Sequence, residues 1–163
     1  IQTLILMPIT GLMQGQQPLI SYNYGALKIE RVKETLKYAI IGATMIALIG
    51  FIAVQFFTKS IVYMFNDEAD VVKLCSHALH IWFMCLPLIG AQVMCANYFQ
   101  AIGKIKISSV LNLLRQIIIL IPCIIIFSSI IGLDGIFIAV PVADLSAFII
   151  TVLLLKNALK KEA

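Results

Sequence analysis

Two charged residues, Arg115 and Asp144, lie deep within long apolar stretches of the sequence. A charge in such surroundings is costly unless it is paired or hydrated, so it commonly marks a functional site. A helical rise of about 1.5 Å per residue puts Arg115 roughly 13 Å beyond Lys106 and Asp144 roughly 18 Å before Lys156. On adjacent antiparallel helices, an arginine side chain spans the remaining offset. We predict an ion pair or a water-bridged contact, either a static pair that sets helix register or an Asp144 that takes up a proton or a cation.

A stripe of polar residues runs along the first apolar stretch, at spacings of seven, four, three and four. These spacings gather the residues on one helical face, and they are Thr3, Thr10, Gln14, Gln17 and Ser21. A neighbouring stripe of Gly11, Gly15 and Pro18 permits close helix packing and local bending. The polar face has two interpretations. It lines a water-filled cavity through Thr10, Gln14, Gln17 and Ser21, or it makes hydrogen bonds to neighbouring helices.

Uncharged amides recur in the later apolar stretches. Gln92 and Asn97 lie on the third stretch, and because an amide in hydrocarbon must find a partner, we predict that both line a cavity. Asn112 and Gln116 are expected near Arg115, on the same helix.

The histidines and cysteines carry weaker signals. His77 and His80 lie one helical turn apart, a spacing compatible with proton relay, but a histidine at a membrane interface also serves as a plain polar anchor. The cysteines have no CxxC spacing and indicate neither a disulfide framework nor a zinc site; they are Cys75, Cys85, Cys95 and Cys123. We therefore expect no metal site and no cofactor.

The amino-acid composition indicates whether these residues lie in a soluble protein or in a membrane protein. Of the 163 residues, 61% are hydrophobic and 12% are charged, against about 25% charged in soluble proteins. The mean hydropathy of +1.03 indicates an integral membrane protein. The net charge of +4 is spread over short loops, so the chain lacks the continuous basic face of a nucleic-acid binder. The chain opens at Ile1 inside an apolar run, without the features of a signal peptide, and we interpret it as a fragment.

Five apolar stretches are long enough to cross a bilayer, and helices are the structure that satisfies backbone groups in lipid. The predicted spans are about residues 1–24, 38–58, 76–100, 108–128 and 136–155. Residues 26–37 combine Lys and Glu with apolar residues at helical spacing, which predicts a short amphipathic helix on the cytoplasmic membrane surface. Asn66 or Asp67 is a natural N-cap for the helix that follows.

Basic residues set the predicted orientation, because Lys and Arg are retained on the cytoplasmic side. Nine of them fall on one side of the five spans, namely Lys28, Arg31, Lys33, Lys37, Lys104, Lys106, Lys156, Lys160 and Lys161. Only Lys59 and Lys73 fall on the other side, and Arg115 lies within a span. We therefore expect a multi-pass protein of the cytoplasmic membrane with a cytoplasmic C-terminus.

Four segments resemble the multidrug and toxic compound extrusion (MATE) transporters. GLMQGQQPLISYNYGALKIERVKETLK (residues 11–37) resembles the end of the family's eighth helix and the following cytoplasmic loop. NYFQAIGK (97–104) is similar to its tenth helix, LRQIIILIP (114–122) to its eleventh and GIFIAVPVAD (135–144) to its twelfth. The nearest branch in character is bacterial, with the staphylococcal drug exporters and the DNA-damage-inducible members.

This resemblance implies an all-α membrane protein of twelve helices in two six-helix lobes, in which the chain would supply helices eight to twelve, most of the C-terminal lobe. The N-terminal lobe and the seventh helix would then be missing partners. In the family those missing regions carry acidic residues that bind sodium ions or protons. Some members add a tenth-helix carboxylate, but here that helix has Gln92 and Asn97 instead.

The function implied is a Na⁺- or H⁺-coupled antiporter that exports organic cations and other amphipathic drugs across the lipid bilayer. The alternative is a flippase for lipid-linked sugars on a related fold, for which only Arg115 is available to meet a pyrophosphate. An enzyme would need clustered histidines and acids at one depth, and His77, His80 and Asp144 do not form such a catalytic set. A purely structural subunit would not need the polar stripe on the first span.

Overall fold

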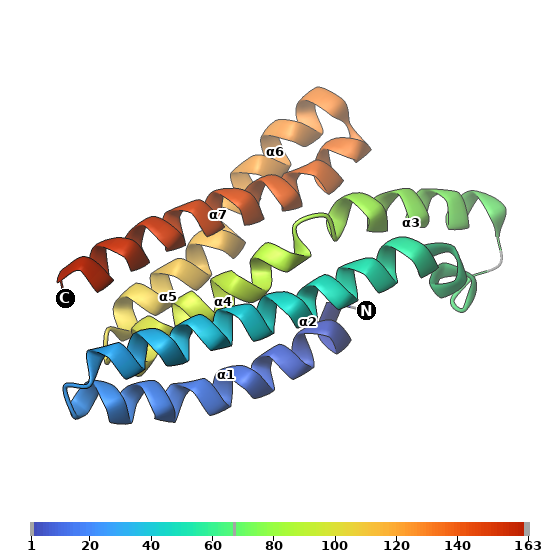
Figure 1. Ribbon diagram of the computed structural model, residues 1–163. Helices are drawn as coiled ribbons and strands as arrows, with labels where there is room; N and C mark the ends of the chain where they lie inside the picture. Colours follow the sequence, from blue (N-terminus) through green and yellow to red (C-terminus); the bar gives the residue numbers. More distant parts are fainter. Residues whose placement is uncertain (1, 67, 162–163) are drawn as a thin grey trace.

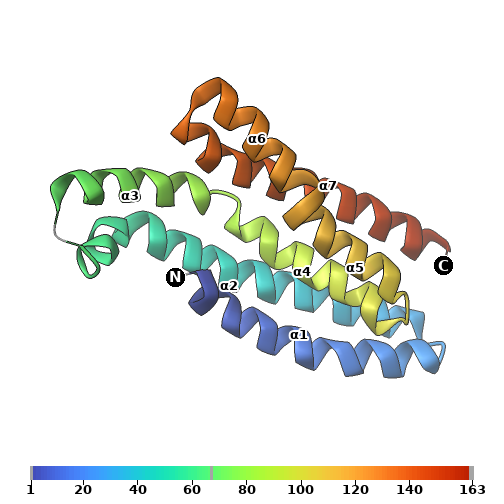
Figure 2. The same ribbon diagram turned by 180° about the vertical axis from the view of Figure 1, so that it is seen from behind.

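The computed structural model describes residues 2–66 and 68–161, and nearly all of these are helical. The helices are α1 (Gln2–Gly25), α2 (Ile29–Tyr63), α3 (Ala69–Trp82), α4 (Leu86–Ala101), α5 (Ile105–Leu113), the π-helix η1 (Leu114–Ile119), α6 (Leu120–Ile131) and α7 (Leu133–Lys161). They pack side by side in an elongated bundle (Figures 1 and 2). The predicted all-α fold is confirmed, but several helices begin or end at other residues than the predicted spans do.

Helix α4 lies at the centre of the bundle, in contact with α1, α2, α5 and α7. Its sequence is mostly apolar or small, with amides at Gln92, Asn97 and Gln100, and most of its residues are buried, as expected for a core helix. Ala39, Ala43 and Ala47 of α2 are buried at every fourth position. Small residues on both helices let the two backbones approach closely, at Gly90 of α4 in particular.

The predicted surface helix at residues 26–37 is wrong as a separate element, because Ile29–Tyr63 form one continuous helix. No proline interrupts these residues. Val32 and Leu36 are buried on the same face as Ala39 and Ala43. The apolar side of the amphipathic segment therefore packs on protein, and the chain turns at 26–28, where Leu27 has a φ of 57°.

The predicted third span, residues 76–100, is broken into two helices. Helices α3 and α4 meet at an angle of 45°, and the break covers residues 83–85. Pro87 explains it, because proline has no N–H for the carbonyl of Phe83 and its ring excludes a continuing helix. The break lies beside Trp82, which becomes part of the candidate site.

The last two spans form a tight pair. Helices α5, η1 and α6 run as one stretch from Ile105 to Ile131, and Gly132, with a φ of 73°, reverses the chain into α7. A Cβ atom on Gly135 would lie 2.0 Å from the carbonyl oxygen of Phe127. Glycine at this position therefore permits the close approach of α6 and α7.

In the part of the chain that the structure describes, three stretches are long and apolar enough to cross a membrane: Ile29–Tyr63, Ile105–Ile131 and Leu133–Lys160. The bent pair of α3 and α4 makes a fourth if it is one span. Helix α1 has the predicted bounds to within a residue, but its glutamines and other polar residues make it less apolar than the others. Large apolar side chains such as Phe56 and Ile125 are exposed on the outer surface, as suits contact with lipid.

The loops divide between the two ends of the bundle. The α1–α2 and α4–α5 connections lie at the same end as the C-terminus (Figure 1), and both carry basic residues. The α2–α3 and α6–α7 connections lie at the opposite end. The predicted N-cap at Asn66 is wrong, because α3 begins at Ala69 and its N-cap residue is Glu68. Asn66 Oδ1 instead accepts a 2.8 Å hydrogen bond from the N–H of Glu68, and Asp67 lies outside the described residues.

Candidate functional site

The predicted contact between Arg115 and Asp144 is present. Nε of Arg115, on η1, donates a hydrogen bond of 2.6 Å to Oδ1 of Asp144, on α7. The two side chains are 18% and 3% exposed. A charge-assisted hydrogen bond of this kind is among the stronger polar contacts in a protein, and it joins the two antiparallel helices of the last pair.

Arg115 lies on a π-helical segment. Pro122 has no N–H to donate to the carbonyl of Ile118, so the ordinary helical ladder is interrupted here. The chain widens into η1 over Leu114–Ile119, and such wider turns occur frequently at functional sites. Arg115 and Gln116 both lie on η1 and both line the cavity described next.

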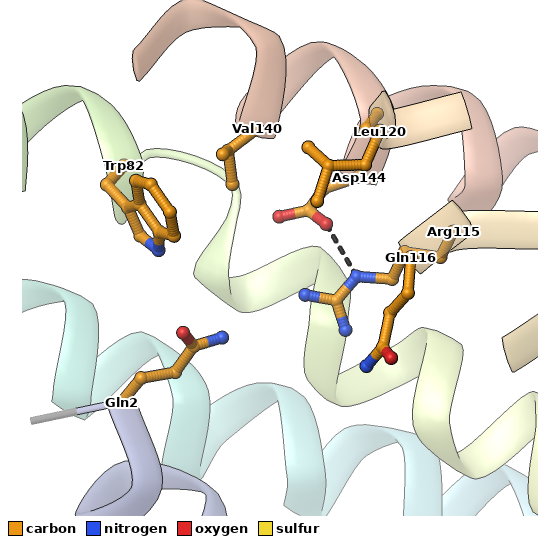
Figure 3. Close-up of a pocket in the computed structure, with 8 residues that line it drawn as sticks. Gln2, Trp82, Arg115, Gln116, Leu120, Val140 and Asp144 are labelled. Atoms are coloured by element: carbon orange, nitrogen blue, oxygen red, sulfur yellow. Dashed lines mark hydrogen bonds and ion pairs between the residues drawn. The ribbon is translucent and has the colours of Figure 1, made fainter. Parts of the chain in front are cut away.

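A cavity of about 330 Å³ lies beside the ion pair, between the start of α1, the end of α3, η1, the start of α6 and α7. Figure 3 shows the side chains around it. The lining residues are Gln2, Trp82, Arg115, Gln116, Leu120, Val140, Ala143 and Asp144. Residues from five elements, α1, α3, η1, α6 and α7, thus bring charged, amide and aromatic groups to one apolar-walled hollow, the arrangement expected of a ligand site.

Only one of the two carboxylate oxygens of Asp144 has a hydrogen-bond partner among the described residues. Its Oδ2 atom is buried and has no hydrogen-bond partner. A buried acceptor without a partner is unfavourable, so this oxygen is a place where a proton or a cation would be stabilised. The geometry is compatible with both sequence interpretations of the pair, the static one and the titrating one.

The polar stripe of α1 does not join this cavity. Thr3, Thr10, Gln14 and Ser21 are exposed and Gln17 is half-buried. Thr10 donates a 2.7 Å hydrogen bond to the carbonyl of Met7 in its own helix. The lining of a water-filled path by Thr10, Gln14 and Gln17 remains a prediction, which the open face of α1 permits.

Side-chain hydrogen bonds join α1 to α4. They involve Ser21 and Asn97, which were predicted as polar residues of interest, and Gln16, which was not. Ser21 Oγ donates to the carbonyl of Ala101 at 2.8 Å, in the last turn of α4, where carbonyls lack helical partners. Asn97 Nδ2 donates to the carbonyl of Met13 at 3.2 Å. Gln16 Nε2 donates to the carbonyl of Met94 at 3.4 Å.

Gln16 was not singled out from the sequence, although a signal was present. It lies at helical spacing between Ile9 and Ile20, and all three are buried, so it belongs to the packing face of α1. Gln92 and Asn97 are also buried, at 4% and 2% exposure. The side-chain oxygens of all three amides lack partners. Gln92 and Asn97 are thus closed off from the Arg115 cavity in this structure, and their lining role stays a prediction.

A second hollow lies between α1 and α2. It is the larger, at about 500 Å³, and its lining includes Gly11, Gly15, Gln16 and Tyr38. It contains no charged residue among those that line it. The Arg115 cavity, which has charged residues in its lining, is therefore the better candidate for a site that binds an ion or a charged ligand.

The two histidines make separate contacts and do not form a pair. His80 contacts Gln55 of α2 through ring Nδ1, and Gln55 Nε2 donates a 3.1 Å hydrogen bond to the carbonyl of His80. His77 Nε2 lies 3.4 Å from Oδ1 of Asp134 at the start of α7. Among the residues that the structure describes, no three His, Cys, Asp or Glu side chains gather to hold a metal ion.

Comparison with known proteins places these features in context. A protein-family model described as MatE matches residues 1–126. The multidrug export protein MepA of Staphylococcus aureus (strain MSSA476) is 30% identical over 150 residues, which is 90% of this chain and 33% of MepA. MepA of Staphylococcus haemolyticus (strain JCSC1435) is 28% identical over 136 residues, 83% of this chain and 30% of the relative.

Solved structures agree with the sequence relatives. The MATE multidrug transporter DinF-BH matches with a TM-score of 0.88 and 38% identity over 94% of this chain and 34% of that one. An inward-facing MATE transporter of the MOP superfamily matches with a TM-score of 0.93 over 99% of this chain and 38% of that one. At 23% identity, this second likeness concerns the fold alone. The chain spans about a third of the length of these proteins.

Proposed function

The chain belongs to the MatE family, whose relatives compared above are multidrug transporters, and from this membership we propose that it works as part of a cation-coupled antiporter. The antiporter would export organic cations and other amphipathic drugs in exchange for Na⁺ or H⁺. The described helices would form most of the C-terminal lobe and one wall of the substrate path. An N-terminal lobe and a seventh helix would supply the rest.

The observation that carries this proposal is the buried ion pair beside a cavity. Asp144 offers Oδ2 without a partner, and Arg115 holds the other oxygen. Uptake of a proton or a Na⁺ ion by Asp144 would weaken its attraction to Arg115. The balance between two arrangements of η1 and α7 would then depend on the ion, and a ligand with different affinity for each arrangement would be coupled to it.

The proposed orientation follows the positive-inside rule. The basic α1–α2 and α4–α5 connections lie at one end of the bundle with the C-terminus (Figure 1). We place this end in the cytoplasm, in a bacterial cytoplasmic membrane. The exposed apolar residues between the two ends would face lipid.

A flippase for lipid-linked sugars is the second candidate. It is favoured by one observation, that the guanidinium of Arg115 faces a cavity and is available for a phosphate. It ranks second because, among the residues that line the cavity, Arg115 is the single basic one, and a pyrophosphate in an apolar site is best met by several.

The test uses everted membrane vesicles that contain the full-length protein. Transport of a fluorescent organic cation is recorded while Na⁺ and H⁺ gradients are imposed separately. Transport that follows one gradient supports the antiporter and identifies its coupling ion. An absence of transport under both gradients, with the protein verified in the membrane, contradicts the antiporter and favours the lipid-linked substrate.

A further inference from the structure

The ion pair presents its cation to the cavity and hides its anion. The side chain of Asp144 is 3% exposed and that of Arg115 is 18% exposed, and Oδ2 of Asp144 has almost no accessible surface. A ligand in the cavity would therefore meet the guanidinium first. Resting on the proposed function, we propose that this cavity binds the hydrogen-bond-acceptor end of an amphipathic substrate, and a carboxylate in preference to an uncharged carbonyl, while the cationic part of the substrate lies outside it.

The hydrogen bond to Asp144 leaves most of the guanidinium available. It uses Nε of Arg115, whereas a guanidinium carries further N–H groups on its two terminal nitrogens. In Figure 3 these terminal nitrogens point away from Asp144, into the space between Gln2 and Gln116. A carboxylate there would receive two parallel N–H groups in the geometry that arginine offers to planar anions.

The other polar groups of the cavity also donate. Trp82 has an indole N–H, which is a donor and never an acceptor, and Figure 3 shows this nitrogen on the side facing Gln2. The amides of Gln2 and Gln116 donate or accept as the ligand requires. Asp144 is the single acidic residue among those that line the cavity, and Arg115 already neutralises it. An organic cation would thus find no net negative charge here.

Size and wall chemistry fit one end of a substrate. The volume of about 330 Å³ lies at the lower limit for ligand pockets, which span about 300 to 1,000 Å³. Leu120, Val140 and Ala143 supply apolar wall, and the ring of Trp82 supplies an aromatic face. A ring that bears a carboxylate or an ester would be accommodated, while the body of a larger dye would extend beyond.

The test compares two probes that differ in one group, rhodamine B with its free carboxylate and rhodamine B ethyl ester. Binding to the full-length protein in lipid nanodiscs is followed by dye fluorescence anisotropy, which requires no transport. We expect the carboxylate dye to bind about tenfold more tightly than the ester, the order expected for an added hydrogen bond to a charged group. Equal affinity, or a preference for the ester, would overturn the proposal.

Variants of the lining residues test whether the preference for the carboxylate dye arises in this cavity. Gln116→Glu adds a negative charge beside Arg115 and is expected to abolish the preference for the carboxylate dye. The matched control is Gln100→Glu, because Gln100 is exposed at the far end of α4 and does not line the cavity; it should leave the preference unchanged. Trp82→Phe keeps the ring, removes the N–H and should weaken carboxylate binding severalfold. Equal effects of Gln116→Glu on both dyes would contradict the proposal.

The outcome is distinguishable from failure of the proposed function. If the dyes bind with the expected preference and no ion gradient moves them in vesicles, the antiporter is wrong and the acceptor site stands. If a gradient drives transport of both dyes and binding shows no preference, the antiporter stands and the acceptor site is wrong.

Discussion

A Cβ atom added to Gly90 of α4 would lie 2.6 Å from the carbonyl oxygen of Ala43 in α2. The atom in the way belongs to backbone, which cannot rotate aside as a side chain can. The contact lies in the middle of the closest helix pairing around α4, where Ala47 also packs against Gly90. Small residues therefore permit the close contact of α2 and α4 at the centre of the bundle.

Gly90→Ala is expected to destabilise the protein by about 1 to 3 kcal/mol, because overpacking forces the helices apart. Gly11→Ala is the matched control, since an added Cβ there has no atom within 4 Å. Alanine favours a helix over glycine by about 1 kcal/mol, so the control should be equal to or more stable than the parent. Thermal unfolding in detergent compares them, and equal stability of the two variants would contradict the packing argument.

Breaking the ion pair from one side is expected to cost more than removing it. Arg115→Met or Asp144→Leu alone should destabilise by about 3 to 5 kcal/mol, since each leaves a buried charge unpaired. The double variant should lose less than either single one. A double-mutant cycle from thermal unfolding in detergent measures the difference. Additive losses would mean that the 2.6 Å contact contributes no coupling energy.

Asp144→Asn separates the static interpretation from the titrating one. The amide keeps an acceptor for Nε of Arg115 but does not ionise. We expect ion-coupled export in everted vesicles to be lost while the amount of protein in the membrane stays the same. Asp134→Asn is the control, because Asp134 is exposed at the start of α7. Undiminished coupled transport by Asp144→Asn would show that the pair is structural.

The interhelical amide of α1 should contribute to stability and its exposed neighbour should not. Gln16→Leu is expected to cost about 1 kcal/mol, typical of an interhelical hydrogen bond in a membrane protein. Gln14→Leu, on the exposed side of the same helix, is the control and should change stability little. Thermal unfolding in detergent measures the stability of both variants. Equal losses would mean that the hydrogen bond from Gln16 to Met94 does not stabilise the protein.

Thiol labelling tests whether the open face of α1 is wet. In a cysteine-free background of the full-length protein, Gln14→Cys and Gln17→Cys should react with a membrane-impermeant maleimide, and substrate should slow the reaction. Ile9→Cys is the buried control at 0% exposure and should stay unlabelled. Protection of Gln14→Cys to the same degree as Ile9→Cys would favour dry packing.

Much of the fold follows from residue type and order. The apolar stretches predicted the helices, and the basic residues predicted which loops share one end of the bundle. The predictions failed where the structure of a segment depends on the helices that pack against it. Residues 26–37 looked like a surface helix because their apolar side has no visible partner in sequence, whereas Leu36 packs in the core with Tyr98 and Phe99 of α4.

The candidate site divides in the same way. The depth of Arg115 and Asp144 along their helices is a matter of counting residues, so their contact was predictable. The placement of Gln2 and Trp82 at the same cavity was not, because it depends on the break before Pro87 and on how α1 packs against α2 and α4.

The sequence by itself determined that the chain is a membrane protein, which stretches are helical, and that one acid and one base are buried at compatible depths. These properties depend only on the residue types and their spacing within each stretch of sequence. The tertiary structure alone decided that Arg115 is more exposed than Asp144 beside the cavity. It also decided that Gln16 and Asn97 bond across α1 and α4 while Gln14 stays open. The reason is that a helix has several faces, and whether a polar side chain meets water, lipid or a backbone carbonyl depends on which neighbouring helix covers its face.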